Sequence, residues 1–410
     1  AAWSFSAQAI SSISNFILTI SVLAVASRRD FAVFSLCITT YLLVSQLARS
    51  ASALPVMILY SDRDGGHEQV DEHRAVGVAV LVGLAAALVL FGLALFNQQA
   101  REQFLILGVA VPLLLFQESA RHLSFARSTP HIATLSDGLW LTLQVAGSLA
   151  AWGMGSATVP VLLAVWAASG AAAGLFAAYR LGIAPGISGS VRWLREHRSL
   201  WAKLVVEFVV NSGSFYLLLY GLALLAGIDQ LGQLRAAQTL IGPVIVILLA
   251  GNALGIPESV RIRRDGRRLR RLCGVLSAGL AAAAAVWGML IYLLLPTLGP
   301  ALFPNSWETA RPLIPMLSVY AAAVGISTGG GSGLRALGEN AWITRYRAVS
   351  GGLALLVGLP LSTTIGADGV LIALAATETL FAGLAWIHLA RTAGGSPDED
   401  GEELESFVPM

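Results

Sequence analysis

The sequence has few charged residues. Only 12% of its 410 residues are charged, whereas a soluble globular domain carries about 25%. Hydrophobic residues make up 56% of the chain, and its mean hydropathy is +0.73. So few charges cannot cover the surface of a water-soluble globule. We therefore expect most of the surface to face lipid.

Cysteine and lysine are nearly absent. Cys37 and Cys273 both lie inside apolar runs, and neither belongs to a C-x-x-C motif or to a metal-ligand spacing. This excludes a disulfide framework and indicates no metal site. Lys203 is the only lysine. Arginine in place of lysine, together with abundant alanine, is typical of bacteria with GC-rich genomes.

Motifs of catalysis are also missing. The sequence contains no G-x-S-x-G, no P-loop, no H-E-x-x-H and no domain-sized polar segment, and the loops expected outside the cell are short and nearly uncharged. We therefore expect a protein that is not an enzyme, needs no cofactor and has no nucleic-acid partner.

Long apolar stretches fill the chain instead. Each covers about 20 residues or more, enough to cross about 30 Å of hydrocarbon as a helix. Backbone in lipid must satisfy its own hydrogen bonds, which favours helices. We predict an all-α polytopic membrane protein of about twelve transmembrane helices: 3–26, 31–59, 75–96, 103–125, 131–152, 157–179, 200–226, 230–256, 270–295, 309–334, 342–365 and 368–390.

The basic residues predict the orientation. Nineteen of them fall in loops after even-numbered spans, among them Arg345 and Arg347, and five fall in loops after odd-numbered spans. Cytoplasmic loops carry the excess of arginine and lysine. Both termini are therefore expected in the cytoplasm. The densest run, Arg261–Arg271, is read as a topology signal that also contacts anionic phospholipids. The alternative is a docking surface for a cytoplasmic enzyme or for the chain's own acidic tail.

The chain has an internal division. Two lobes of six helices, 1–180 and 200–392, flank a basic cytoplasmic linker at 181–199, and an acidic tail at 393–410 has the composition of a disordered segment. The two halves resemble each other, since the second span ends in Ser52–Pro55 and the eighth ends in Leu254–Pro257, about 200 residues later. Two parallel repeats of this kind place a central cavity between the lobes.

Arg49 is the strongest candidate for a functional residue within a span. It lies in the second span about 10 residues, or about 15 Å, from the expected cytoplasmic end. A charge at that depth is costly, so it faces a cavity or a partner. The planar fork of arginine fits phosphate. An anion site and a structural ion pair with a buried carboxylate both remain open.

Several acids also lie within spans. Glu118 and Arg121 are three residues apart on one helical face, which favours local pairing. Asp137 and Glu207 lie within three turns of the cytoplasmic ends, where each lines a vestibule or reaches the interface. Glu378 is nearest mid-membrane. A buried carboxylate can carry a coupling proton, and Glu207 and Glu378 are the best candidates for that role.

The tenth span contains a run of small residues, Ser327–Gly333, with four glycines. Each glycine weakens a helix by about 1 kcal/mol relative to alanine. Two interpretations stay open, a hinge that lines the cavity and close packing between helices.

Several stretches together resemble one known family, the polysaccharide exporters of the multidrug/oligosaccharidyl-lipid/polysaccharide (MOP) flippase superfamily. The similarity covers most of the chain except the tail, and it rests on the order and spacing of Gln8–Phe16, Asp30–Leu36, Phe125–Arg127 with Pro130, Ala133, Asp137, Trp140 and Gln144, Gly232–Pro243, and Leu334–Gly338.

The resemblance implies export of a polyprenyl-diphosphate-linked oligosaccharide across a bacterial plasma membrane, by alternating access between two six-helix lobes. It also implies basic residues that hold the diphosphate, and it assigns Arg49 first and Arg235 second to that role. Glycan-assembly enzymes would be the protein partners.

Three other functions stay open. The first is export of small molecules by a major facilitator, because Asp62–Gly65 and Arg264–Arg268 resemble a loop signature of that family. A drug/cation antiporter of the same superfamily would concentrate carboxylates in one lobe, whereas a lipid-linked-sugar flippase would concentrate arginines in its cavity. A membrane enzyme or a non-transport subunit of glycan assembly is the third alternative.

Overall fold

The computed structural model describes residues 2–60, 69–302, 305 and 307–393. The acidic tail and the Asp62–Gly65 stretch therefore lie outside the described residues, apart from Ala393. Every regular element in the described part is helical. The elements are α1 (Ala2–Val25), α2 (Arg28–Ala51), α3 (Ala53–Tyr60), α4 (Gln69–Phe96), α5 (Arg101–Ala126), α6 (Pro130–Gly153), α7 (Val159–Leu181), α8 (Ile187–Glu196), α9 (Arg198–Phe208), a π-helix (Val209–Gly213), α10 (Ser214–Leu225), α11 (Ile228–Ile262), α12 (Gly266–Leu302), α13 (Trp307–Ala310), a 3-10 turn (Arg311–Leu313), α14 (Ile314–Ala336), α15 (Asn340–Ile365) and α16 (Ala367–Thr392).

The helices confirm the predicted class, an all-α polytopic membrane protein. Within the described ranges, eleven helical segments are long and apolar enough to cross a membrane. They correspond to eleven of the twelve predicted spans. The remaining one, 131–152, is the 24-residue helix α6, whose buried face carries Thr134, Ser136, Asp137, Gln144 and Ser148.

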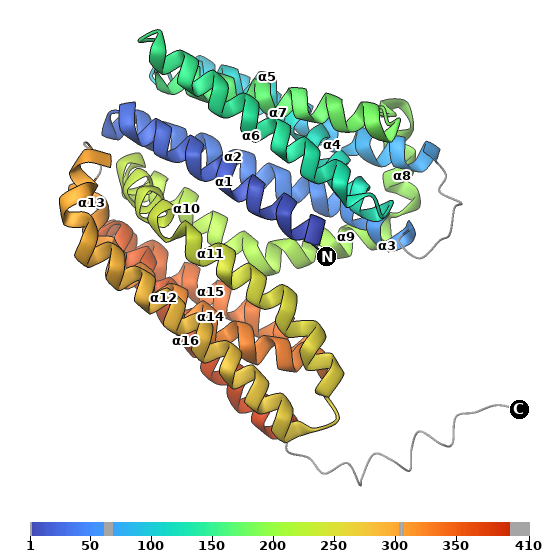
Figure 1. Ribbon diagram of the computed structural model, residues 1–410, viewed down its shortest axis with the longest axis vertical. Coiled ribbons are helices and arrows are strands. Elements are labelled where there is room, and N and C mark those ends of the chain that lie inside the picture. Colours follow the sequence, from blue (N-terminus) through green and yellow to red (C-terminus); the bar gives the residue numbers. More distant parts are fainter. Residues whose placement is uncertain (1, 61–68, 303–304, 306, 394–410) are drawn as a thin grey trace, which may run out of the picture. The chain divides into compact units, whose positions relative to one another are not determined.

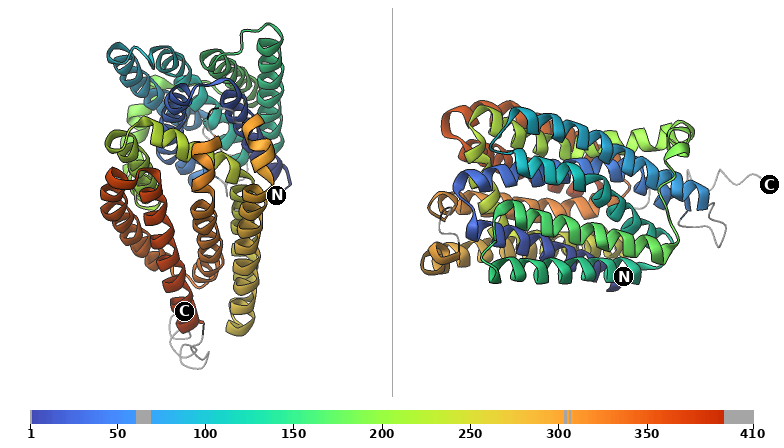
Figure 2. Two further views of the ribbon diagram at one scale, coloured as in Figure 1. Left: turned by 90° about the vertical axis from the view of Figure 1, so that its left-hand side faces the viewer. Right: turned by 90° about the horizontal axis from the view of Figure 1, so that it is seen from above.

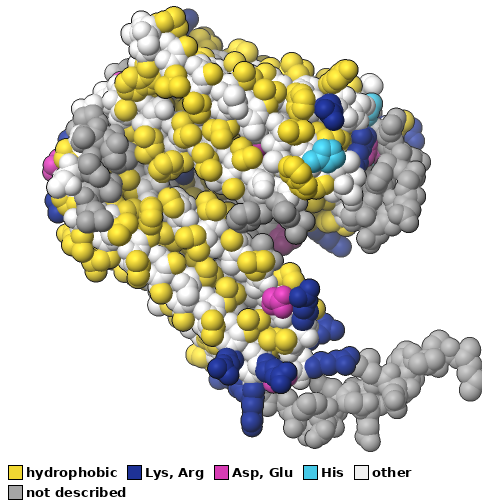
Figure 3. Space-filling model, viewed as in Figure 1, with side chains coloured by type: hydrophobic (Ala, Val, Ile, Leu, Met, Phe, Trp, Pro, Cys, Tyr) yellow, Lys and Arg dark blue, Asp and Glu magenta, His cyan; other side chains and the backbone are white. Residues whose placement is uncertain are grey.

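The outer surface is apolar. Leu88, Leu224 and Leu356 lie in spans, yet 72%, 83% and 74% of their surfaces are exposed. Hydrophobic side chains cover most of the face shown in Figure 3. In water this exposure would be a large penalty, at about 25 cal/mol per Å². The pattern is that of a surface solvated by lipid.

Two compact units divide the described chain. Unit 1 comprises 1–239 and 297–310, and unit 2 comprises 240–296 and 311–410. Helices α11 and α12 therefore each contribute to both units. The predicted lobe boundary at 181–199 does not coincide with this division, and the arrangement of two lobes around a central cavity stays a prediction.

Unit 1 is a bundle of long helices, in which α4 packs on α5, α5 on α7 and α1 on α6. Figure 2 shows these helices running side by side. Helices α4 and α5 meet closely because Gly83 faces Pro112, and a Cβ at Gly83 would lie 2.6 Å from the Pro112 Cα. Small residues allow such close approach in membrane helices.

The predicted linker is partly helical. Helix α8 lies against α4, where the Ser190 hydroxyl donates to the Arg74 carbonyl and the Gly186 N–H donates to the His73 carbonyl. Trp193 is fully buried, while Arg192 and Arg195 are exposed or half-buried on the helix. Helix α8 is thus a docked amphipathic helix rather than a flexible connection.

Unit 2 contains the glycine-rich run, and here the structure decides between the two interpretations. Helix α14 is unbroken through Ser327–Gly333, and all seven residues are buried. A Cβ at Gly329 would lie 2.4 Å from the Cys273 carbonyl oxygen, and one at Gly325 would lie 2.9 Å from the Ala281 nitrogen. Close packing against α12 is therefore confirmed for this segment.

Two spans differ in detail from the predicted internal repeat of the two halves. The second span is interrupted at Ser52, between α2 and α3, three residues before Pro55. Helix α11 instead continues through Pro243 and Pro257 to Ile262. The proline positions therefore match in sequence without producing the same break.

Candidate functional site

A buried ion pair joins α5 to α6 in unit 1. The Arg121 Nε donates to Asp137 Oδ2 over 2.8 Å, and both side chains are almost completely buried. Arg121 lies about 8 Å from the end of α5 and Asp137 about 10 Å from the start of α6. Asp137 is buried, and whether it lies at a vestibule or near the membrane interface stays a prediction. It neutralises an arginine inside the helix bundle.

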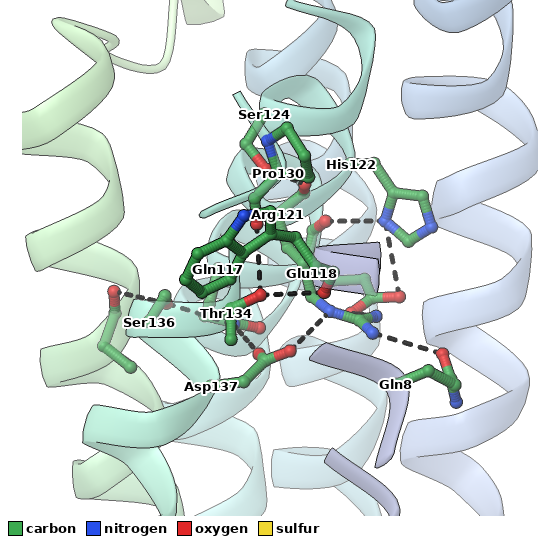
Figure 4. A network of polar contacts seen from close by, with 12 residues as sticks. Gln8, Gln117, Glu118, Arg121, His122, Ser124, Pro130, Thr134, Ser136 and Asp137 are labelled. Atoms are coloured by element: carbon green, nitrogen blue, oxygen red, sulfur yellow. Dashed lines mark hydrogen bonds and ion pairs between the residues drawn. The ribbon is translucent and has the colours of Figure 1, made fainter. Parts of the chain in front are cut away.

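Further polar groups surround this pair (Figure 4). Arg121 Nη1 lies 3.6 Å from Glu118 Oε2, which confirms the predicted i, i+3 pairing, but this contact is longer than the one to Asp137. Arg121 Nη2 donates to Gln8 Oε1 on α1 over 3.2 Å. Glu118 also lies 3.5 Å from His122 Nδ1. Three helices thus share one charge network.

The network extends through neutral side chains. The Gln117 amide donates to Asp137 Oδ1, and the Ser136 hydroxyl donates to the Ala173 carbonyl on α7. Ser14 on α1 donates to Gln144 on α6, whose amide donates back to the Ser14 carbonyl. These bonds hold α1, α5, α6 and α7 in register, because an unsatisfied polar group would be costly in a bundle surrounded by lipid.

A small cavity lies beside the network. Its volume of about 30 Å³ is lined by Ser11, Ser14, Asn15, Tyr41, Gln117, Glu118, Asp137 and Trp140. A polar cavity of this size holds a water molecule or two. It is too small for an organic substrate, so it serves solvation of Glu118 and Asp137 rather than substrate binding.

Arg49 has no such partner. It is half-buried near the end of α2, and no carboxylate in the described part of the chain lies within ion-pair distance of it. Its Nε is buried and donates no hydrogen bond. The Arg49 charge acts on Glu118 and on His122 without direct contact. The two terminal Nη atoms of Arg49, rather than its buried Nε, are therefore the donors that could meet a ligand.

Arg235 lies in the part of α11 that belongs to unit 1, about 10 Å from the start of the helix. Its Nη1 donates to Gln238 Oε1 over 3.2 Å, and it too makes no ion pair with a described carboxylate. Both Arg49 and Arg235 lie within electrostatic range of the hydroxyl of Tyr216 in α10.

Glu207 lies apart from these networks. It is exposed on α9, about 14 Å from the start of that helix, and it makes no ion pair with described residues. The next turn is the π-helix Val209–Gly213, in which Asn211 is also exposed. π-Bulges frequently mark functional sites. A carboxylate exposed to hydrocarbon is costly, so Glu207 must face water or a polar ligand.

Unit 2 holds a second buried ion pair. Arg347 Nη1 on α15 donates to Glu378 Oε2 on α16 over 2.8 Å, and the Ser327 hydroxyl on α14 donates to Glu378 Oε1. Glu378 is 5% exposed. Arg347 lies inside α15, about 10 Å beyond Asn340. Arg347 and Arg345, which the sequence analysis counted among the loop arginines, thus both lie within α15.

Two ion pairs were missed by the sequence analysis. Nothing in the sequence identified Arg347 as a partner of Glu378, because Arg347 lies near the polar end of a span. Glu72, in the first turn of α4, is 1% exposed and pairs with Arg127 at the end of α5, which also donates to the Leu181 carbonyl. The i, i+3 and i, i+4 spacing rules detect partners on one helix, so they cannot find a pair whose members lie 55 residues apart on two helices.

The basic run Arg261–Arg271 covers the end of α11, the turn that follows it and the start of α12. Most of its arginines are exposed, and they form the dark-blue cluster near the end of unit 2 in Figure 3. Asp265 Oδ1 accepts from the N–H groups of Arg267 and Arg268, which starts α12. The run is therefore an ordered turn between two helices with most of its arginines exposed.

No protein-family model matches the chain, and no curated protein matches its sequence. Solved structures do match its fold. An inward-facing multidrug resistance MATE family transporter of the MOP superfamily matches with a TM-score of 0.66 at 14% identity, over 95% of this chain and 98% of that one. A MOP superfamily transporter from Pyrococcus furiosus matches with a TM-score of 0.60 at 12% identity, over 96% and 94% of the two chains. That transporter is described as having a binding pocket of reverse polarity, which suggests a different function for it.

The fold therefore defines the class of this protein as a multi-pass helical membrane protein. Its particular architecture is a MATE-like fold, the fold of these solved transporters.

Proposed function

We propose that this protein is a flippase that moves a polyprenyl-diphosphate-linked oligosaccharide from the cytoplasmic to the outer leaflet by alternating access. The observation that supports this proposal most directly is the state of the two arginines in unit 1. Arg49 and Arg235 make no ion pair with a described carboxylate, and both lie within electrostatic range of Tyr216.

The distribution of charge favours an anionic substrate. Asp137 is neutralised by Arg121, and Glu378 by Arg347. Glu118 lies beside both Arg121 and His122. The buried acids are thus occupied by the protein's own cations, whereas Arg49 and Arg235 keep donors free. A site for organic cations would require the opposite arrangement.

A diphosphate suits such a site. The guanidinium fork binds phosphate oxygens in a bidentate manner, and a phenolic hydroxyl adds a further donor. Desolvation of the arginines within the membrane strengthens each of these contacts. A polyprenyl chain would remain in lipid while the diphosphate and the glycan enter the protein.

The remaining assignments belong to the same proposal. The protein resides in a bacterial plasma membrane with both termini in the cytoplasm, where the arginines of the α11–α12 turn contact anionic phospholipids. Its product is used by enzymes that assemble the cell envelope, and these enzymes are its partners.

A second function, export of organic cations, is favoured by one observation. Glu207 is an exposed and unpaired carboxylate inside a span, and the MATE family structures with the same fold are described as multidrug resistance transporters. In this alternative Glu207 binds the cation.

Transport into liposomes decides between the two functions. The purified protein is reconstituted, and the appearance of a fluorescent polyprenyl-diphosphate oligosaccharide in the opposite leaflet is measured beside proton-driven movement of ethidium. The proposed function predicts flipping of the lipid, no ethidium transport, and a Glu207→Gln protein that still flips. Ethidium transport that Glu207→Gln abolishes, with no lipid flipping, would replace the proposal by the alternative.

A further inference from the structure

The arginine of the unit 2 ion pair has unused binding capacity. An arginine carries five N–H donors. Among described residues, Arg347 uses one nitrogen, Nη1, on Glu378 Oε2. Its Nε and Nη2 donate no hydrogen bond to the described part of the chain, so the edge that these two nitrogens form is open.

The guanidinium is held in a fixed orientation. Its central carbon lies 4.2 Å from the ring centroid of Phe381, over the ring face. Phe381 is only 2% exposed, so the ring itself cannot move freely. Glu378 anchors one end of the guanidinium, and Ser327 in turn fixes Glu378. An arginine held by a ring and a carboxylate loses little rotamer freedom when it binds a ligand.

The arginine is the more accessible partner of the pair. The side chain of Arg347 is 30% exposed, whereas that of Glu378 is 7% exposed. Arg347 lies within a helix long and apolar enough to span a membrane, where a charge exposed to hydrocarbon is costly. Its exposed part must therefore meet water or a polar ligand.

We propose that Arg347 is a phosphate-binding residue of unit 2, which presents its Nε and Nη2 edge to the diphosphate group of the substrate, and that Glu378 and Phe381 position it. The inference rests on the proposed function, because it takes the polyprenyl diphosphate as the ligand. Two parallel N–H···O bonds to one phosphate are the geometry that this edge offers. Glu378 holds the guanidinium and at the same time weakens its attraction for anions through its own negative charge.

The other charged and titratable groups around the pair fit this role. Helix α14 contributes Tyr320, whose hydroxyl lies within electrostatic range of both Arg347 and Glu378. Ser327 on the same helix contributes a neutral hydroxyl. No further acid of the described residues forms an ion pair with Arg347. One arginine and one carboxylate thus face each other beside neutral donors (α14, α15 and α16 in Figure 1).

Binding of geranyl diphosphate to the full-length protein in nanodiscs tests the inference, with inorganic diphosphate as the probe without a lipid chain. Arg347→Lys keeps a cation beside Glu378 and removes the fork, so affinity should fall about tenfold while the melting temperature stays nearly constant. Glu378→Gln removes the opposing charge and should raise the affinity several-fold. Arg345→Lys, at an exposed arginine two residues away, is the matched control and should leave binding unchanged.

The outcomes separate the inference from the proposed function. Unchanged affinity in Arg347→Lys and in Glu378→Gln, with a loss in Arg49→Lys, overturns the role of Arg347 and leaves the flippase proposal standing. Absence of geranyl diphosphate binding to the unaltered protein overturns both. Equal loss of geranyl diphosphate and inorganic diphosphate in Arg347→Lys supports recognition of the phosphates themselves, and a loss confined to the lipid probe supports a site that also needs the chain.

Discussion

Asp137 Oδ2 lies 2.8 Å from Arg121 Nε across the interface between α5 and α6, and both side chains are buried. Besides this pair, the Gln117 amide on α5 also donates to Asp137 Oδ1 on α6. In lipid, where water cannot replace a missing partner, such a pair fixes how the two helices rotate against each other.

Asp137→Ala should therefore destabilise unit 1. The change leaves Arg121 with the longer contact to Glu118 and the hydrogen bond to Gln8, and breaking a buried ion pair by removing one partner costs about 3–5 kcal/mol. We expect a lower melting temperature and a smaller monodisperse peak in detergent by fluorescence-detected size-exclusion chromatography. The double variant Arg121→Met/Asp137→Leu should recover most of this stability. A single variant as stable as the original protein would show that the pair does not hold the helices together.

Gly329→Ala should disturb the contact between α14 and α12. The new Cβ would lie 2.4 Å from the backbone oxygen of Cys273, which cannot move without shifting α12. Overpacking of this kind costs about 1–3 kcal/mol. Gly279→Ala on α12 is the control, because nothing lies within 4 Å of its Cβ. We expect a clear fall in melting temperature for Gly329→Ala and none for Gly279→Ala. Equal melting temperatures would contradict the close packing of α14.

Arg264→Cys tests the orientation in intact cells. Arg264 is exposed at the α11–α12 turn, and both native cysteines are buried, so background labelling should be low. The arginine excess predicts a cytoplasmic turn. A membrane-impermeant maleimide should therefore label Arg264→Cys only after the membrane has been opened. Labelling in sealed cells, at the rate seen in opened ones, would reverse the predicted topology.

The sequence predicted the helices well because hydropathy reports where lipid surrounds the chain. The stretch 103–125 became α5, Arg101–Ala126, and 131–152 became α6, Pro130–Gly153. The same signal failed at helix ends that leave the membrane. Helix α11 runs six residues beyond its predicted end at 256, since arginine and glutamate are good helix formers in water.

The candidate site was predictable only in part. The depth of Arg49 in its helix follows from residue counting, and so does the pairing of Glu118 with Arg121. The pairing of Arg121 with Asp137 and of Arg347 with Glu378 depends on how neighbouring helices rotate and slide against each other. That arrangement comes from side-chain packing over whole interfaces, which no local pattern encodes.

The last prediction concerns Arg49, and it decides whether this residue binds the substrate. Because its Nε has no partner and no described carboxylate contacts it, Arg49→Ala should abolish flipping of the lipid-linked oligosaccharide while protein level and melting temperature stay near those of the original protein. Arg49→Lys keeps the charge and loses the bidentate fit, so it should restore only part of the activity. Arg195→Ala, at an exposed arginine of helix α8, controls for a general loss of positive charge and should flip normally. If Arg49 instead balances the nearby charge of Glu118, its removal would destabilise the bundle by about 3–5 kcal/mol, and the double variant Arg49→Ala/Glu118→Gln would fold again. Measured side by side, protein level and flipping rate separate these two roles, and normal flipping by a well-folded Arg49→Ala protein would exclude Arg49 from the diphosphate site.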